Sequence, residues 1–588
     1  MSPPTRSPLP QPQFLPMAQS ELNRLKWDAI DVLLVSGDAY VDHPTFGVPL
    51  LGRWLVAHGF RIGIIAQPRW DRPDDILRLG RPRLCAGITS GSLDSMLAHY
   101  TAFRKQRSDD AYTPGGLAGQ RPNRAVIVYS NLVRQAFPGL PLVLGGIEAS
   151  MRRVSHYDFW TDALRHSILL DSKADLLAYG MAEQSLLEAV QRLDQAAPGQ
   201  HPADALAGIS GTVRCATART PIPAATVPLP AHEAIRQDPF QLVTATLAIE
   251  AQIHRGGPVL TQQDGIRTLV IEPPADPLDQ TVLDRLYELP FTRLPHPSYQ
   301  QPVPALEPVR FTVTTHRGCA GGCTFCALAL HQGRRIQSRS VPGILREVRD
   351  MHRLTGWNGI LNNVGGPTAN FWGARCTAPT SSCRRTSCLW PAPCPHFKTD
   401  QVGLAALLRK LAALPGMRQV RSASGIRTDA ALREPAYLDA LLRDFVGGQL
   451  TVAPEHRSPR VLDLMRKPSF EGFEEFVRCF EAAGKRSGRE QYIVPYLMSA
   501  FPGCTDRDMR ELAAWFRQRG WKPRQVQCFI PTPGTVATAM YWSGKAPDGT
   551  PIHVARSDAE RLRQHGLLID SPAPPSRGTV NRRRRSAP

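Results

Sequence analysis

Long hydrophobic runs are missing from this chain of 588 residues. No stretch of about 18 consecutive apolar residues occurs, which is the length that a transmembrane helix needs. The start of the chain, MSPPTRSPLPQPQFLPMAQS, is rich in proline and lacks the apolar segment of a secretory signal. The sequence therefore predicts a cytoplasmic protein that has no membrane partner.

Lysine is scarce although the chain is basic. Only 9 of the 70 basic residues are lysines, and the net charge is +19. This charge is compatible with nucleic-acid binding, but the basic residues are scattered and no RNA-binding module is recognisable. The one dense run, Arg582–Arg585, lies in a tail of proline, serine and arginine that we expect to be disordered. Nucleic acid is therefore a compatible partner without specific support.

The twelve cysteines are unevenly distributed, and seven of them fall between residues 319 and 394. Disulfide frameworks are typical of short secreted chains, whereas clustering in a long chain of this kind indicates metal binding or catalysis. The other five are dispersed, and we interpret them as core or incidental residues: Cys85, Cys215, Cys479, Cys504 and Cys528.

The first part of the chain predicts an open, doubly wound α/β domain of Rossmann-like type over residues 27–220, after a disordered segment 1–26. Apolar runs alternate with helical patterns there. The expected strands are Asp31–Ser36, Arg61–Ala66, Leu84–Thr89, Ala125–Tyr129, Pro141–Gly146 and Leu176–Gly180, and a helix is expected over Phe46–His58. Residues 221–308 are rich in proline and predict an irregular connector with one helix near Gln241–His254.

Residues 309–534 predict a partial (β/α)6 barrel of the TIM type, because six strand patterns alternate with helical ones. The expected strands are Val309–Thr315, Gly359–Val364, Gln419–Ser424, Gln449–Ala453, Gln491–Leu497 and Gln525–Ile530. The clearest helix runs from Phe470 to Gly484, and a cysteine-rich insertion covers 373–397. Residues 535–588 predict a short C-terminal extension with a disordered, arginine-rich tail.

Three cysteines follow the first expected barrel strand with the spacing C-x-x-x-C-x-x-C: Cys319, Cys323 and Cys326. Four thiolates complete a structural zinc site or an ordinary iron–sulfur cube, whereas three leave one iron of a [4Fe–4S] cluster without a protein ligand. An open metal position is typical of a site that performs chemistry. Glycines between the cysteines allow a tight loop. In barrels of this type, functional residues gather where strands end.

This motif, with Phe325 before the last cysteine, resembles the signature of the radical S-adenosylmethionine (SAM) superfamily. The resemblance implies a [4Fe–4S] cluster and SAM as cofactors, with the SAM amino and carboxylate groups on the open iron. It also implies reductive cleavage of SAM to a 5′-deoxyadenosyl radical, and an external one-electron donor of the flavodoxin or ferredoxin type. Longer segments resemble the YgiQ family of radical SAM proteins, whose substrate is unassigned: THRGCAGGCTFCALALHQGRRIQSRS, GGPTANFW, SASGIRTD, TVAPEHRSPRVLDLMRKP, VPYLMSAFPGCT and GGIEASMRRVSHYDFW.

The same resemblance predicts the residues around SAM. Gly365, Gly366 and Thr368 stand where such barrels carry a Gly-Gly-Glu segment near the SAM amino group, or they form only a tight turn. Ser424 and Arg427 follow the third strand, where polar groups bind the ribose and carboxylate; a surface salt bridge is the alternative for Arg427. Ser422 belongs to the same stretch. Glu455 and His456 end the fourth strand, and for His456 a structural hydrogen bond is the competing interpretation.

A second cysteine group lies in the insertion: Cys376, Cys383, Cys388 and Cys394, separated by six, four and five residues. Four thiols can enclose a second iron–sulfur cluster or a structural zinc ion, and free thiols are the remaining alternative.

The N-terminal domain resembles, in position and pattern, the cobalamin-binding domains that precede some radical SAM barrels. Its nearest match to their D-x-H-x-x-G motif is DHPTFG, in which His43 lies one residue too far from Gly47. Cobalamin is therefore not predicted. The stretch GGIEASMRR offers Arg152 and Arg153 to an anion, or forms a plain turn.

Three functions remain open, and the catalytic residues are unknown. The first is a radical SAM enzyme with an unknown substrate. The second is a methylthiotransferase-like enzyme that modifies RNA or a protein with the help of an auxiliary cluster. The third is an iron–sulfur electron carrier, which would need neither a barrel nor an open iron.

Overall fold

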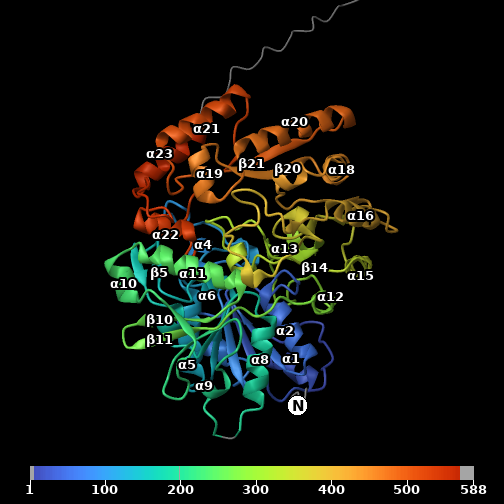
Figure 1. Ribbon diagram of the computed structural model, residues 1–588. Coiled ribbons are helices and arrows are strands. Elements are labelled where there is room, and N and C mark those ends of the chain that lie inside the picture. Colours follow the sequence, from blue (N-terminus) through green and yellow to red (C-terminus); the bar gives the residue numbers. More distant parts are fainter. Residues whose placement is uncertain (1–5, 198, 570–588) are drawn as a thin grey trace, which may run out of the picture.

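The computed structural model describes residues 6–197 and 199–569, and Figure 1 shows them as two halves. The N-terminal half is built on one large sheet, and the C-terminal half on a partial barrel that lies above it in this view. Within the described ranges, no helix combines the length and the apolar character that crossing a membrane requires.

The N-terminal sheet has nine strands in the order β2-β1-β3-β4-β7-β8-β11-β10-β9. The first five in this order run parallel, and their valine, isoleucine and leucine side chains are buried. Such apolar runs are typical of parallel strands that helices cover on both faces. The strands are β1 (Val32–Ser36), β2 (Ile62–Ala66), β3 (Cys85–Thr89), β4 (Leu142–Leu144), β7 (Leu176–Ala178), β8 (Thr212–Cys215), β9 (Thr226–Leu229), β10 (Val259–Asp264) and β11 (Arg267–Ile271).

Two helical layers enclose this sheet. Helix α2 (Gly47–Ala57) packs against α8 (Glu183–Asp194), and α5 (Ala125–Ala136) packs against α7 (Ile168–Ser172). The chain leaves β1 toward β2 on one side and returns to β3 on the other, so the order of strands reverses between β1 and β3. Ligands of open α/β sheets bind at such a reversal, outside the carboxyl ends of the strands.

Shorter elements complete the N-terminal half. A hairpin is formed by β5 (His156–Asp158) and β6 (Ala163–Arg165). The remaining helices are α1 (Gln19–Leu25), α3 (Asp74–Leu77), α4 (Ser95–His99), α6 (Gly146–Met151), α9 (Pro202–Ala205), α10 (His232–Gln237), α11 (Gln241–Arg255), α12 (Gln280–Tyr287) and α13 (Leu306–Val309).

Three expectations for this half differ from the structure. The segment before residue 27 is ordered from residue 6, because Leu15 and Leu22 are fully buried and anchor it. The run Ala125–Tyr129 starts helix α5, since Val126, Tyr129 and Val133 share one buried face. The connector 221–308 is not irregular, because β9, β10 and β11 extend the sheet. The one helix predicted there is observed as α11.

The C-terminal half is the predicted barrel of six parallel strand positions. Strand β12 pairs with β16, β15 pairs with β19, a bridge joins Ile426 to Val452, and β20, β21 and β22 follow in order. The strands are β12 (Thr312–Thr314), β15 (Ile360–Leu361) with β16 (Asn363–Gly365), β19 (Gln419–Val420), β20 (Gln449–Glu455), β21 (Tyr492–Ser499) and β22 (Gln525–Cys528). The predicted fold class, an open α/β domain followed by a partial barrel, is confirmed.

Helices cover the outside of the barrel strands (Figure 1). They are α15 (Val341–Met351), α16 (Gln401–Ala412), α17 (Thr428–Ala431), α18 (Pro435–Ala440), α19 (Pro459–Met465), α20 (Phe470–Ser487) and α21 (Asp506–Gln518). Helix α20 continues past Gly484, the predicted end, and stops where Gly488 adopts a left-handed φ of 63°. Two further helices, α22 (Val536–Ser543) and α23 (Asp558–Ile569), end the described chain; the predicted disorder of Arg582–Arg585 lies outside the described residues.

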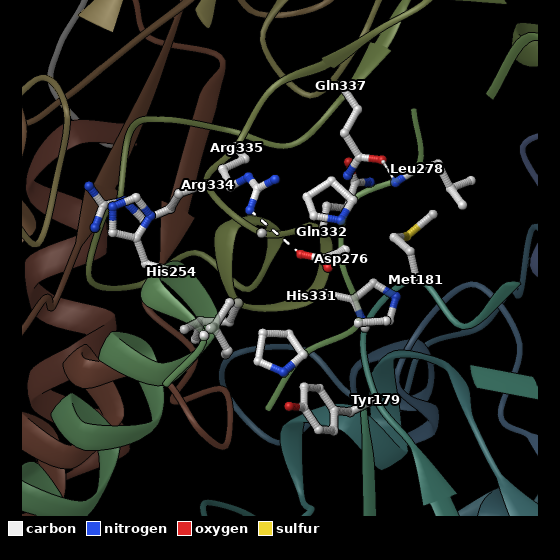
Figure 2. A pocket seen from close by; sticks show the side chains of 18 of the residues that line it. Tyr179, Met181, His254, Asp276, Leu278, His331, Gln332, Arg334, Arg335 and Gln337 are labelled. Atoms are coloured by element: carbon white, nitrogen blue, oxygen red, sulfur yellow. Dashed lines mark hydrogen bonds and ion pairs between the residues drawn. The ribbon is translucent and has the colours of Figure 1, made fainter. Parts of the chain in front are cut away.

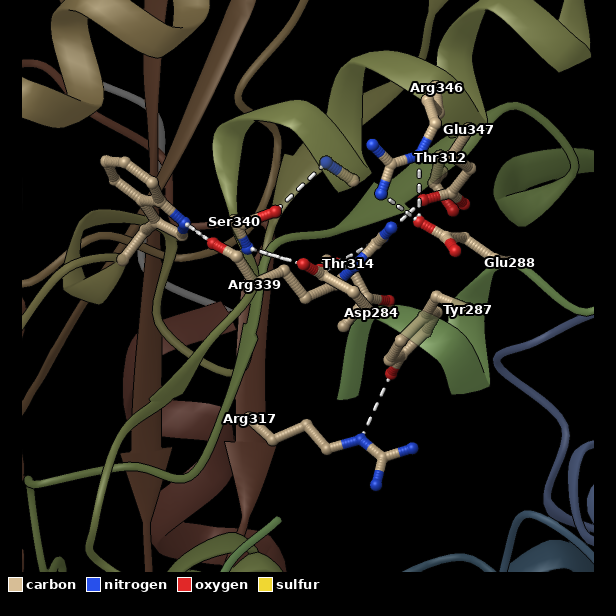
Figure 3. A network of polar contacts seen from close by, with 12 residues as sticks. Asp284, Tyr287, Glu288, Thr312, Thr314, Arg317, Arg339, Ser340, Arg346 and Glu347 are labelled. Carbon is tan, nitrogen blue, oxygen red and sulfur yellow. Dashed lines mark hydrogen bonds and ion pairs between the residues drawn. The ribbon is translucent and has the colours of Figure 1, made fainter. Parts of the chain in front are cut away.

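A buried network of charges joins the two halves (Figure 3). Glu347 on α15 forms ion pairs with Arg339 and Arg293, and all three side chains are almost fully buried. Arg293 also donates to the carbonyls of Arg310 (2.8 Å) and Thr312 (3.0 Å), at the start of the first barrel strand. Glu347 is therefore shared by two buried guanidinium groups at the junction, and Asp284 Oδ1 adds a second carboxylate 3.5 Å from Arg339 Nε.

Candidate metal centre

The cysteine triad lies on the loop between β13 (His316–Arg317) and α14 (Leu328–Gln332). A Cβ atom added to Gly321 would lie 3.5 Å from Cys319 Sγ, 3.7 Å from Cys323 Sγ and 3.3 Å from Arg427 Nη1. These three atoms therefore surround one small space. Gly322 adopts a φ of 61°, and a side chain there would collide with the carbonyl of Thr386 at 2.5 Å. The loop thus has the tight shape that the sequence predicts.

The donor set fits an iron–sulfur cluster. Burial raises the pKa of the Cys323 thiol, and burial together with the neighbouring thiols raises the pKa of Cys326 to about 12. Without a metal the thiols keep their protons, and metal ions displace protons when they bind thiolates. The positive charges of Lys467 and Arg427 act on Cys323 and favour its thiolate. The surroundings therefore suit a negatively charged group bound by the three sulfurs.

Thr368 lies beside the triad, and Gly366 lies against His316. Thr368 Oγ1 is 3.5 Å from Cys319 Sγ. A Cβ atom at Gly366 would lie 2.6 Å from the His316 carbonyl oxygen and 2.7 Å from its Nε2. The His316 ring is buried, which lowers its pKa to about 4, and Nε2 has no hydrogen-bond partner among the described residues. His316 is a site residue that our sequence reasoning missed, although it precedes the first cysteine by only three positions.

We expect Gly366→Ala to destabilise the fold by about 1–3 kcal/mol, because the methyl group overlaps the His316 backbone. Binding of SAM should weaken in the same variant. Thermal unfolding and equilibrium dialysis with SAM measure the two effects. Gly472→Ala on α20, where nothing lies within 4 Å, is the matched control and should be neutral or slightly stabilising. Equal behaviour of the two variants would contradict the close approach of His316.

Ser424 and Arg427 are brought to the same mouth, and Arg427 forms an ion pair there, although a buried one. Ser424 accepts a hydrogen bond from Asn363 Nδ2 at 2.7 Å. Arg427 donates through Nε and Nη2 to both oxygens of Asp429, each at 2.9 Å. Burial opposes the charge of Arg427, yet Asp429 outweighs burial and raises its pKa. Asp429 thus occupies the edge formed by Nε and Nη2, and Nη1 is the nitrogen that faces the triad.

Glu455 and His456 have different surroundings. Glu455 adopts a left-handed φ of 65° at the end of β20, and burial raises the pKa of its carboxyl group. Lys467 Nζ lies 3.9 Å from Glu455 and donates to the carbonyl of Ala453 at 2.6 Å. His456 is fully buried and accepts hydrogen bonds at Nδ1 from the next two backbone N–H groups. Its Nε2 lies 3.4 Å from Cys504 Sγ, so both ring nitrogens have partners. Lys467 is the charged neighbour that sequence reasoning missed.

The second cysteine group lies on the insertion, which folds against the triad loop. Cys388 N donates to the carbonyl of Ala320 at 3.1 Å, and Cys394 N donates to the carbonyl of Cys388 at 2.8 Å. Cys388 is buried and Cys376 is exposed. The group is therefore adjacent to the triad, as its position in the sequence predicts.

A cavity of about 770 Å³ separates the two halves. One wall is the carboxyl edge of the N-terminal sheet at the β1/β3 reversal, with Ser36, Asp38 and Gly91. The opposite wall is the barrel mouth, with His316 and the 365–367 segment. Most of the lining side chains are apolar: they include Leu34, Phe46, Leu50, Ile64, Ile88 and Leu144.

The N-terminal residues considered as ligands do not line this cavity. His43 is fully buried, and its ring contacts Thr45 Oγ1 (2.8 Å) and Arg293 Nη1 (2.9 Å), so both nitrogens are engaged. Arg152 pairs with Asp94, and Arg153 stacks on a tyrosine ring instead of reaching the cavity. These residues hold the fold together; the glycines of GGIEASMRR are the part that borders the cavity.

A smaller pocket of about 130 Å³ opens on the outer side of the cluster loop (Figure 2). Arg335, His254 and Arg255 line it, and Arg335 is 45% exposed and weakly paired with Asp276. Gly333, also in its wall, accepts a hydrogen bond from Cys319 N at 3.1 Å. A hydrogen bond therefore connects the wall of this positively charged pocket directly to the backbone of the triad loop.

Family comparisons agree with this geometry. The profile "Radical SAM N-terminal" matches residues 14–312, and "Radical SAM superfamily" matches residues 313–516. A UPF0313 protein of Geobacter sulfurreducens is 49% identical over 95% of this chain and 92% of its own length. A UPF0313 protein of Pseudomonas putida is 40% identical over 94% of this chain and 81% of its own length.

One solved structure shows the same fold. The radical SAM methyltransferase TsrM of Kitasatospora setae, with cobalamin and a [4Fe–4S] cluster bound, has a TM-score of 0.50 and 15% identity over 91% of this chain and 85% of that one. The sequence prediction of the family and of its cofactor class, a [4Fe–4S] cluster and SAM, is confirmed. This chain belongs to the UPF0313, or YgiQ-type, family of radical SAM proteins.

Proposed function

We propose that this protein is a radical SAM enzyme that modifies a small molecule held between its two halves. When bound, the cluster and SAM supply a 5′-deoxyadenosyl radical that abstracts hydrogen from the substrate. The observation that carries the proposal is the convergence of Cys319, Cys323 and Arg427 at the mouth of a barrel whose opening faces a large cavity.

The chain's own residues have distinct tasks in this proposal. The three triad thiolates hold the cluster. Carbonyl groups of the 365–366 turn accept hydrogen bonds from the SAM ammonium, and Ser424 binds the ribose. Arg427 and Lys467 balance the negative charge of the thiolates, while Asp429 keeps Arg427 in place.

The cavity favours a small substrate over a macromolecule. It lies between the sheet edge and the barrel mouth, and most of its lining is apolar, which suits a ligand with a large apolar part. The charged groups in its wall are already paired: Glu183 with Arg317 at 2.7 Å, and Asp38 with Arg121 at 3.1 Å. A methylthiotransferase-like activity on RNA or protein is the second candidate, and the cysteine-rich insertion beside the triad favours it.

Product analysis tests the proposal. Protein reconstituted without oxygen, reduced with dithionite and given SAM should release 5′-deoxyadenosine. Metabolite extract from a strain that lacks the gene should increase this release if the substrate is a small molecule, whereas RNA or ribosomes should do so for the second candidate. A protein that only exchanges electrons and leaves SAM intact would be the carrier.

We further propose that the external one-electron donor binds at the basic pocket of Figure 2. Flavodoxins and ferredoxins are acidic, and opposite charges accelerate encounter. Arg335→Glu should slow reduction of the cluster by flavodoxin about 10-fold at low ionic strength. Stopped-flow spectroscopy measures this rate.

Two controls accompany that variant. Arg349→Glu reverses an exposed charge on α15, away from the pocket, and should keep the wild-type rate. Reduction by dithionite should be equal in all three proteins. A loss with dithionite as well, or an equal loss in both variants, would place the donor elsewhere.

A further inference from the structure

The cysteine-rich insertion contains a second site that SAM cleavage itself does not require. We propose that Cys376, Cys383, Cys388 and Cys394 bind a second iron–sulfur cluster, with Arg334 as its buried counter-charge. The proposal goes beyond the function argued above and does not depend on it, because its test reads metal content and not activity.

The first support is that the insertion is anchored where a cluster can be held rigidly. Besides the Cys388 backbone contact with Ala320, Ser387 Oγ donates to the carbonyl of Gly321 at 2.5 Å. The same serine oxygen accepts from the N–H groups of Leu389 (3.0 Å) and Trp390 (3.1 Å). The segment that carries Cys388 is therefore fixed on both sides.

The second support is the approach of the four cysteines in space. Strands β17 (Arg375–Cys376) and β18 (Phe397–Lys398) pair so that Cys376 lies opposite Phe397. Phe397 N donates to the carbonyl of Cys394 at 3.1 Å, which brings the first and last cysteines to the same end of the hairpin. Cys394 and Cys383 also lie close enough to Cys388 for their charges to act on it.

The third support is the electrostatics of Arg334. Its side chain is buried, with 4% exposed, and donates to Cys388 Sγ at 3.4 Å and to the carbonyl of Arg385 at 2.7 Å. In the described part of the chain, no carboxylate lies within ion-pair distance of it. An uncompensated buried guanidinium is costly. Thiolates that bind a metal supply the missing negative charge, and neutral thiols do not.

The spacing of the sulfurs differs from that of a preformed zinc site. A zinc ion with four thiolates at about 2.3 Å holds the sulfurs about 3.8 Å apart. Among the described residues, no three of the insertion cysteines have sulfurs all within 4.8 Å of one another, and the same is true of the triad.

Metal analysis tests the proposal directly. A variant with Cys319, Cys323 and Cys326 all changed to serine, reconstituted with iron and sulfide, should retain about four irons and four sulfides per chain, against about eight of each in the wild type. After reduction, this variant should show the electron paramagnetic resonance signal of one reduced cluster. About one zinc and no iron, or no metal at all, would overturn the proposal.

The reciprocal variant guards against misfolding. Cys388→Ser with Cys394→Ser should lower the wild-type content to about four irons while the triad cluster remains. Cys215→Ser, which changes a half-buried cysteine outside both groups, should keep about eight. Full iron content in the double variant would contradict the proposed ligands.

Arg334 has its own readout. Reduction adds negative charge to a cluster, so Arg334→Gln should shift the potential of the second cluster to a more negative value, and Arg334→Lys should restore it. Redox titration of the triad-free variant measures this. If Arg334 had only a structural role, the reduction potential of the second cluster would be the same in the Arg334→Gln and Arg334→Lys variants as in the protein with Arg334.

Discussion

Replacing Cys326 with alanine should abolish the cleavage of SAM. The change removes one of the three thiolates on the triad loop, so the cluster loses one of its three proposed protein ligands. The fold should persist, because alanine removes only the thiol group and the loop remains tied through Cys319 N to Gly333. Release of 5′-deoxyadenosine by the reduced protein should fall below detection.

The matched control for this variant is Cys479→Ala on α20, another partly buried cysteine. It should keep both the cluster and the activity. Circular dichroism of the two variants should match that of the wild type. Retained SAM cleavage in Cys326→Ala would refute the assignment of the triad.

Glu347→Gln should have the largest effect on stability. The change keeps the size of the side chain but removes the one carboxylate that Arg339 and Arg293 share. Breaking a buried ion pair on one side costs about 3–5 kcal/mol, because the remaining charge stays buried. Chemical unfolding, followed by circular dichroism, should show a clearly lower midpoint.

Glu288→Gln is the control for this second experiment. Glu288 pairs with Arg346 near the surface, where solvent screens the charges, so the midpoint should hardly move. If both variants unfold alike, the network at the junction does not contribute what its burial implies.

The chemistry of this protein is local in the sequence, and that is why it could be predicted. The spacing of Cys319, Cys323 and Cys326 predicts the cluster, and their place after the first expected strand predicts the end of the barrel at which it lies. The barrel itself follows from six strand patterns that alternate with helical ones. Strands of the barrel were found within a few residues because each alternates with a long amphipathic helix such as α20.

What failed depends on contacts between distant segments. The strands β9 and β10 follow prolines, and they join the sheet through the pairing of β9 with β10 and of β10 with β11. The pairing of Arg427 is local by contrast, because Asp429, which binds two of its nitrogens, lies only two residues further along the chain. Lys467 and Arg334 reach the cysteines from other parts of the chain. Neither the hydrophobic periodicity nor the residue spacing of a sequence predicts such contacts.

The junction between the halves determines how the protein can be divided. A fragment that starts at β12 would lose Arg293, one of the two arginine partners of Glu347, and the sheet left behind would lose the opposite wall of its cavity. We therefore expect neither half to fold stably without the other. Chimaeras with other radical SAM proteins should therefore keep the sheet and the barrel from the same parent. Any fusion point should lie outside residues 290–350.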